Sequence, residues 1–314
     1  MVFGRSYRFA SDIPHVADQG VASPAITPAK GKPKLLQTLL SFGLNLAKEP
    51  PFRLASRYVV KYLPFDVVTK ACWDVVPRPG YLVGLIQATK EAMKDKIDAM
   101  CAIEFGVARG TGLLELQKYA VAVGRHFGIR IDVVGFDTGL GLPNLCGDYR
   151  DHPDLWLPGD YPMDEALLRS KLLPSTRLTI GNVADTVENF VNTQQTIPVG
   201  FISFDMDLYS STSEALKILS LKNRNILKRV VLYFDDVADS SIYHQAAGEY
   251  LAINEFNDLK TGVFIDKWYD VKRRRPFPEA FWTNKMYIAH HLDAISKHRI
   301  TGRPVAQWTC PAGE

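Results

Sequence analysis

The chain has 314 residues, of which 46% are hydrophobic and 23% are charged, and its formal net charge is +3. This composition is that of a soluble globular protein with enough material for a large core. The small net charge argues against a nucleic-acid-binding protein. No apolar run reaches the roughly 18 residues that a transmembrane helix needs.

The four cysteines, Cys72, Cys101, Cys146 and Cys310, form no C-x-x-C pair and lack the spacing of metal ligands. Cys101 lies in an apolar run, where a reduced and buried thiol is expected. Residues 1–20 lack the apolar core of a signal peptide. We therefore expect a cytoplasmic protein.

The N-terminal part of the chain is basic and partly apolar. Residues 1–33 predict a flexible arm, and residues 34–77 predict a helical extension in which 35–46 is apolar on a broad face. The stretch 30–61 carries seven Lys or Arg against a single acid, Glu49. Two interpretations stay open: this stretch lies on an anionic membrane or a partner subunit, or it packs on the main domain with its charges in solvent.

Residues 78–300 predict one α/β domain, and residues 301–314 predict a loose tail. Helical patterns occur at 81–96, 113–127, 165–172, 183–191, 211–221 and 243–256. Apolar, β-rich runs occur at 101–105, 131–136, 178–180, 199–204, 230–234, 263–265 and 286–289. Alternation at these lengths predicts a Rossmann-like, mostly parallel seven-stranded sheet with helices on both faces.

The first strand ends in an acidic residue and three glycines. In MCAIEFGVARGTG (100–112), Glu104 precedes Gly106, Gly110 and Gly112, and a helix follows at once. Glycines let the backbone turn sharply and approach a ligand closely. The spacing G-x-x-x-G-x-G departs from the dinucleotide fingerprint, and the turn resembles motif I of class I S-adenosylmethionine (SAM) methyltransferases. Negative charge beside the turn suits an ammonium and a sulfonium.

Ligands of such sheets bind at the carboxyl ends of the strands. The second strand ends in GFDTGLGLP, where Asp137 can accept both hydroxyls of a ribose. The alternative is that Asp137 only caps the following turn. The third strand ends in IGN, which places Gly181 and Asn182 beside an adenine.

Two pairs of acids follow the fourth and fifth strands. FDMDLYSST contains Asp205 and Asp207, and YFDDV contains Asp235 and Asp236. Neighbouring strands lie about 4.8 Å apart, so four carboxylates would gather and repel one another. A hard divalent cation, usually Mg²⁺, relieves such repulsion. The alternative is that these acids cap the next helix and bond to turn amides.

The motifs IEFGVARGTG, GFDTGLGLP, FDMDLYSST and YFDD stand in the order and approximate spacing of the macrocin-type O-methyltransferases, class I SAM enzymes that act on sugar hydroxyls. The resemblance covers residues 78–260. It implies that Asp205, Asp235 and Asp236 bind Mg²⁺ and that Asp207 is the general base. The chain has LKNRNILKRV where the family has a Pro-Gly-Gly turn, and DDV where the family has DDY, so the acceptor pocket differs.

The resemblance implies a Mg²⁺-dependent SAM O-methyltransferase whose acceptor is a sugar or another small polyhydroxylated molecule, and we expect a homo-oligomer. One alternative is a protein that binds SAM, or assists assembly, without turnover. Another is a nicotinamide oxidoreductase, which would share the fold and Asp137 but predicts no acid cluster.

Three further stretches carry weaker predictions. Loop 144–164 contains several aromatic residues and is long enough to form a lid, although an ordinary surface loop is the alternative. The run KRRR (272–275) predicts a solvated loop, or a phosphate site for a nucleotide-linked or lipid-linked sugar. His244 is the histidine that we would test as a catalytic accessory.

Overall fold

The computed structural model describes residues 43, 46, 49, 52–238, 242–273 and 275–297. The chain divides into a unit of residues 1–47 and a unit of residues 48–314. The predicted arm, the predicted tail and nearly all of the predicted helix 35–46 lie outside the described residues.

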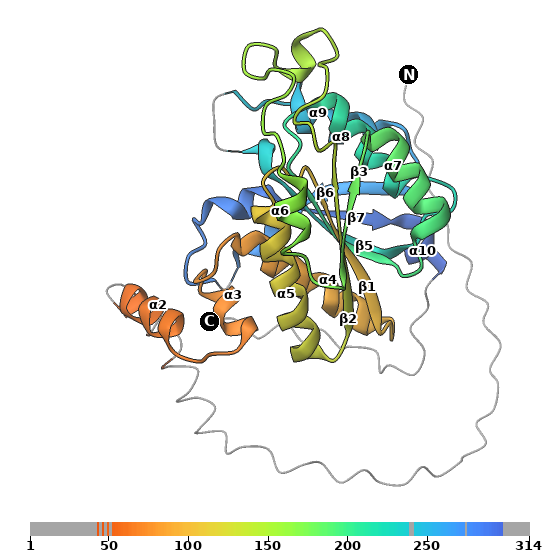
Figure 1. The fold of residues 1–314 in the computed structure, drawn as a ribbon. Coiled ribbons are helices and arrows are strands. Elements are labelled where there is room, and N and C mark those ends of the chain that lie inside the picture. Colours follow the sequence, from red (N-terminus) through yellow and green to blue (C-terminus); the bar gives the residue numbers. More distant parts are fainter. Residues whose placement is uncertain are drawn as a thin grey trace, which may run out of the picture. The chain divides into compact units, whose positions relative to one another are not determined.

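The described chain is built on a seven-stranded sheet in the order β3-β2-β1-β4-β5-β7-β6 (Figure 1). The strands are β1 (Ala99–Phe105), β2 (Arg130–Asp137), β3 (Thr176–Ile180), β4 (Val199–Phe204), β5 (Ile226–Phe234), β6 (Val263–Lys267) and β7 (Met286–His291). Within this sheet, β7 runs in the direction opposite to the other six strands. The predicted Rossmann-like, mostly parallel seven-stranded sheet is therefore confirmed.

The helices in the described residues are α2 (Phe52–Tyr62), α3 (Val67–Cys72), α4 (Pro79–Lys94), α5 (Thr111–Phe127), α6 (Glu165–Arg169), α7 (Val183–Asn189), α8 (Tyr209–Leu216), α9 (Gly248–Asp258) and α10 (Leu292–Lys297). None of them is long and apolar enough to cross a membrane. The helix predicted from residue 243 begins only at Gly248, because Tyr243 lies in a loop and donates a hydrogen bond to Asp236. The pattern also misses α10, since six residues are too few to show a helical period.

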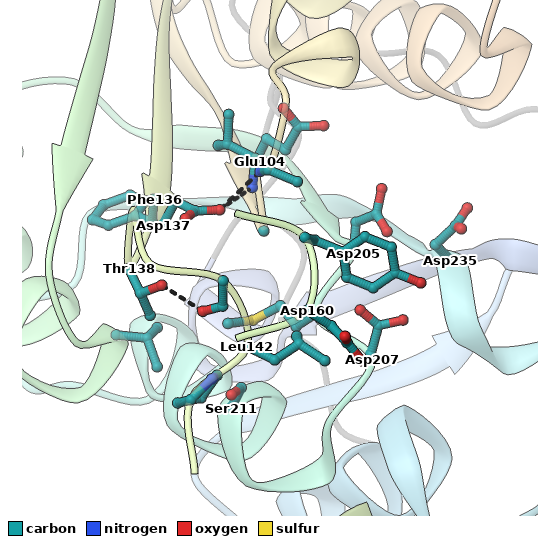
Figure 2. A pocket seen from close by; sticks show the side chains of 18 of the residues that line it. Glu104, Phe136, Asp137, Thr138, Leu142, Asp160, Asp205, Asp207, Ser211 and Asp235 are labelled. Atoms are coloured by element: carbon teal, nitrogen blue, oxygen red, sulfur yellow. Dashed lines mark hydrogen bonds between the residues drawn. The ribbon is translucent and has the colours of Figure 1, made fainter. Parts of the chain in front are cut away.

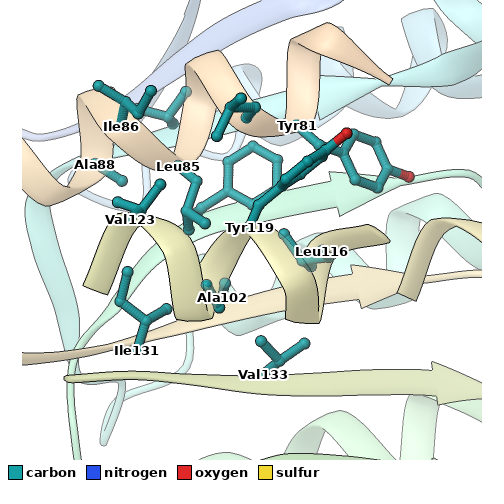
Figure 3. Packing of buried hydrophobic residues seen from close by; sticks show 14 of the residues in the cluster. Tyr81, Leu85, Ile86, Ala88, Ala102, Leu116, Tyr119, Val123, Ile131 and Val133 are labelled. Atoms are coloured by element: carbon teal, nitrogen blue, oxygen red, sulfur yellow. The ribbon is translucent and has the colours of Figure 1, made fainter. Parts of the chain in front are cut away.

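Helices cover both faces of the sheet. On one face, α4 and α5 bury a cluster that includes Tyr81, Leu85 and Leu116 (Figure 3). On the other face, α7, α8 and α9 pack on the sheet through a second buried cluster. Alternation along β1 divides its side chains between the two clusters, with Ala102 in the first and Ile103 in the second. The apolar strands of the sequence are therefore buried on both sides.

Four phenylalanines align across the sheet at the ends of its central strands. Phe105 pairs with Phe136 and Phe204, and Phe204 pairs with Phe234. Their ring centroids lie 4.9, 5.5 and 4.6 Å apart, and the rings are stacked. Because each ring directly precedes a residue of the predicted site, this register places four such residues in a row at the carboxyl edge: Gly106, Asp137, Asp205 and Asp235.

Candidate functional site

A cavity of about 780 Å³ opens at this carboxyl edge. Its volume lies within the range of about 300–1,000 Å³ that is usual for small-molecule sites. The predicted site residues that line it are Glu104, Gly106, Gly112, Asp137, Gly181, Asn182, Asp205, Asp207, Asp235 and Asp236. Gly110 does not line it and instead N-caps α5. The structure thus brings the glycine turn and both acid pairs around one cavity.

The glycine turn is shaped by close contacts within the protein. Gly106 has a φ of +79°, and a Cβ there would overlap the backbone oxygen of Asp205. A Cβ on Gly112 would overlap the carboxylate of Glu104. A side chain at either position would therefore push the turn away from the adjoining strand or from the acid.

Glu104 is a buried carboxylate at the base of the turn. Its Oε1 accepts a hydrogen bond of 2.7 Å from the Tyr81 hydroxyl, and its Oε2 has no partner among the described atoms. Burial raises the pKa of Glu104 to about 8, although the Arg78 guanidinium opposes that rise. A cationic group of a ligand would satisfy the free oxygen and favour the ionised acid.

Asp137 holds the turn together through its carboxylate (Figure 2). Its Oδ2 accepts hydrogen bonds of 2.8 Å from the backbone N–H groups of Val107 and Ala108, and its Oδ1 accepts one of 2.7 Å from Gly139. The turn-capping alternative is therefore present in the structure. Because Asp137 lines the cavity and Oδ1 accepts only one of these bonds, ribose binding by Asp137 stays a prediction.

The end of β3 is also organised by local bonds. The Oδ1 of Asn182 accepts a hydrogen bond of 2.9 Å from Ala184 and N-caps α7, while Gly181 has a φ of +144°. The cap accounts for an asparagine at this position without a ligand. Contact with an adenine stays a prediction for both residues.

Two of the four clustered acids form ion pairs with protein cations. The Oδ2 of Asp205 lies 3.1 Å from Nη1 of Arg78, and the Oδ1 of Asp235 lies 3.1 Å from Nζ of Lys285. Arg78 precedes α4, and Lys285 directly precedes β7. Each acid pair therefore lies beside one protein cation, Arg78 or Lys285.

The other two acids differ in their bonding. Asp236 accepts from the Tyr243 hydroxyl (2.8 Å) and from the backbone N–H of Asp207 (3.2 Å), and its own N–H donates to the buried Glu249 (2.9 Å). By contrast, the carboxylate of Asp207 receives no hydrogen bond from any residue that the structure describes. Figure 2 shows Asp207 beside Asp205 and Asp235.

Burial and mutual repulsion raise the pKa values of this cluster. Burial raises the pKa of Asp205 to about 6, of Asp207 to about 8 and of Asp236 to about 7. The nearest acid adds to each rise: Asp235 acts on Asp205, and Asp236 acts on Asp207. A cation bound at the end of the cavity lined by these four acids would therefore be stabilised by their negative charge.

The donor atoms in this cluster fit a hard cation such as Mg²⁺, because all of them are carboxylate oxygens. Within the described ranges, however, no group of three or more His, Cys, Asp or Glu side chains is arranged to hold a metal. Asp205 and Asp235 face Arg78 and Lys285 instead. Binding a cation would thus require these carboxylates to share or leave their present partners.

Sequence reasoning missed the residues that connect the two ends of the cavity. Arg78 donates to Asp205 and also to the Tyr81 hydroxyl (3.1 Å), which in turn donates to Glu104. The sequence carries only a weak signal for Arg78, because an arginine before Pro79 is explained by its position at the N-terminus of a helix. Only packing of α4 across β1 and β4 brings Arg78 and Tyr81 to the cavity.

Loop 144–164 forms part of the cavity wall through Asn144, Trp156, Asp160 and Tyr161. It is anchored at Asp151, which is fully buried and accepts bonds from Cys146 N–H (2.6 Å) and from the N–H (2.8 Å) and hydroxyl (2.7 Å) of Ser210. Any closure must therefore occur about this anchor, and the lid stays a prediction.

Two of the weaker sequence predictions change. The Arg275 side chain of the KRRR run is only 9% exposed and pairs with Asp74 at 2.6 Å, so the prediction of a solvated loop is wrong for that residue. His244 does not line the cavity; its ring lies 5.6 Å from that of His152.

No family model matches the sequence, and no curated protein matches it. Among solved structures, one described as the O-methyltransferase NovP is 18% identical with a TM-score of 0.42, covering 58% of this chain and 72% of that chain. The calicheamicin methyltransferase CalS11 is 19% identical with a TM-score of 0.43, covering 87% and 99%. An apo structure of CalS11, described as a TDP-rhamnose 3'-O-methyltransferase, is 18% identical with a TM-score of 0.38, covering 83% and 96%.

Proposed function

We propose that this chain is a SAM-dependent O-methyltransferase that uses Mg²⁺ and acts on a hydroxyl of a sugar or another small polyhydroxylated acceptor. The observation that carries the proposal is the single cavity lined by the glycine turn at one end and by four acids at the other. A two-substrate transfer needs both reactants side by side. The free cysteines Cys72, Cys101 and Cys146 suit a reducing compartment, and we place the enzyme in the cytoplasm.

We assign SAM to the end of the cavity that contains the glycine turn. Glu104 would bind the cationic amino acid part through its unpartnered oxygen, and Asp137 would accept a ribose hydroxyl through Oδ1. Gly106, Gly112, Gly181 and Asn182 would line the nucleoside.

We assign the acceptor and Mg²⁺ to the acidic end. Asp205, Asp235 and Asp236 would hold the cation, and the first two carboxylates would share their oxygens between the cation and Arg78 or Lys285. When bound, SAM supplies the methyl group, and Mg²⁺ lowers the pKa of the acceptor hydroxyl. Asp207 would take the hydroxyl proton, because its carboxylate lines the cavity without a protein donor.

Two alternatives are less well supported. A nicotinamide oxidoreductase of the usual type has the strand order 3-2-1-4-5-6. In this sheet, by contrast, an antiparallel strand, β7, lies between β5 and β6. A protein that binds SAM without turnover has no need for an unbonded acid such as Asp207 in the cavity.

The first test is calorimetric binding of S-adenosylhomocysteine, NAD and NADP, each with and without Mg²⁺. Of these three ligands, we expect S-adenosylhomocysteine to bind and NAD and NADP not to bind. Tight binding of NAD in place of S-adenosylhomocysteine would overturn the proposal. The second test supplies methyl-labelled SAM with free and nucleotide-linked sugars and measures labelled product. A suitable control is Asp270→Asn, an exposed acid paired with Arg273 outside the cavity.

A further inference from the structure

Helix α2 contacts the rest of its unit through Arg53 and Arg57 and buries one apolar side chain, Val60. The Arg53 guanidinium lies 5.1 Å from the centre of the Phe277 ring and 3.2 Å from a Glu279 oxygen. Arg57 lies 4.8 Å from the centre of the same ring and donates a 2.9 Å bond to the backbone oxygen of Asp74. These contacts fix which side of α2 faces the protein.

The opposite side of α2 is apolar and exposed. Leu54, Tyr58 and Tyr62 follow at a spacing of four residues and so share one face, which we call the outer face. They are 58%, 63% and 73% exposed, and the two tyrosine rings stack at 6.4 Å. A surface helix normally buries its apolar stripe against the core. In α2 only Val60 is buried, and the larger apolar side chains of the outer face are left exposed.

Basic side chains lie on α2 itself and on a loop that contacts the residues after it. The Lys61 ammonium lies 5.4 Å from the centre of the Tyr62 ring. Loop 272–275 is tied to the residues after α2, because Arg275 bonds to Ala71 and Asp74, and the Arg273 side chain is 82% exposed. Residues 49–78 and 267–279 together carry ten Lys or Arg against five acids. Since the whole chain sums to +3, the remaining residues sum to −2.

We propose that α2 binds the surface of an anionic phospholipid membrane, with the outer face in the interfacial layer and Lys61 and Arg273 near lipid phosphates. Tyrosine rings with exposed hydroxyls suit this layer, and long basic side chains reach from it to the phosphates. A second copy of the chain is a poorer occupant, because a symmetric contact would place the same positive groups against each other. The proposal does not depend on methyl transfer.

Vesicle flotation of the full chain tests the proposal. We expect binding to vesicles of phosphatidylcholine mixed with phosphatidylglycerol, little binding to phosphatidylcholine alone, and weakening by salt. The variant Leu54→Ser/Tyr58→Ser/Tyr62→Ser should lower the bound fraction by about tenfold or more, because apolar burial drives interfacial binding. The control Leu259→Ser/Phe264→Ser removes exposed apolar groups elsewhere and should bind like the wild type.

Wild-type protein that does not float, or a triple variant that floats equally, would overturn the proposal. Thermal unfolding checks that each variant is folded. Light scattering distinguishes the other occupant: if the triple variant changes a wild-type dimer into a monomer and lipid binding is absent, the outer face is a subunit interface and the membrane proposal is wrong.

Discussion

Replacing Asp137 by alanine should damage the fold as well as ligand binding. The substitution removes the acceptor of three backbone N–H groups, at 2.8, 2.8 and 2.7 Å. Each hydrogen bond to a charged group contributes about 1.5–3 kcal/mol. Because water can replace part of these bonds at the half-buried turn, we expect a loss of about 2–4 kcal/mol rather than the full sum. The midpoint of thermal unfolding should fall by about 5–12 °C.

The variant Asp137→Asn separates the two roles of this residue. Its amide oxygen can still accept from Val107 and Ala108, so only the bond from Gly139 is lost, at a cost of about 1 kcal/mol. If Asp137 also binds ribose, the folded Asn variant should bind S-adenosylhomocysteine about 10-fold or more weakly by calorimetry. An Ala variant that unfolds at the wild-type midpoint would refute the account of the turn. Wild-type affinity in the Asn variant would remove Asp137 from the ribose site.

The remaining predictions concern the acids and the loop. Asp207→Asn should retain S-adenosylhomocysteine and lose turnover by about 10²–10⁴-fold, and a fully active variant would exclude Asp207 as the base. Asp235→Asn should lose Mg²⁺ binding and activity together while keeping S-adenosylhomocysteine affinity nearly intact; undiminished activity of the wild type in excess chelator would instead point to a metal-independent enzyme. If loop 144–164 closes about Asp151, S-adenosylhomocysteine should slow its cleavage by protease, whereas equal cleavage rates with and without ligand would indicate a fixed wall.

Much of the fold and the position of the site follow from local pattern. Apolar runs that stop at Gly106, Asp137, Asp205 and Asp235 predict strands with candidate site residues at one edge. The pairing of Phe105 with Phe136 and Phe204, and of Phe204 with Phe234, places these residues at that edge. These inferences succeed because side-chain alternation and glycine turns depend on neighbours in sequence. The chemistry of a carboxylate at a strand end is likewise determined by the residue itself.

The partners of those acids were decided by tertiary structure alone. Arg78 reaches Asp205, which is 127 positions away, and Lys285 reaches Asp235 across 50 positions. Neither cation has a local pattern that predicts its contact, because the contact depends on how α4 and β7 pack on the sheet. The same reason applies to α2: its periodicity defines its faces, but only the packing of Arg53 and Arg57 on Phe277 and the burial of Val60 determine that Leu54, Tyr58 and Tyr62 point outward.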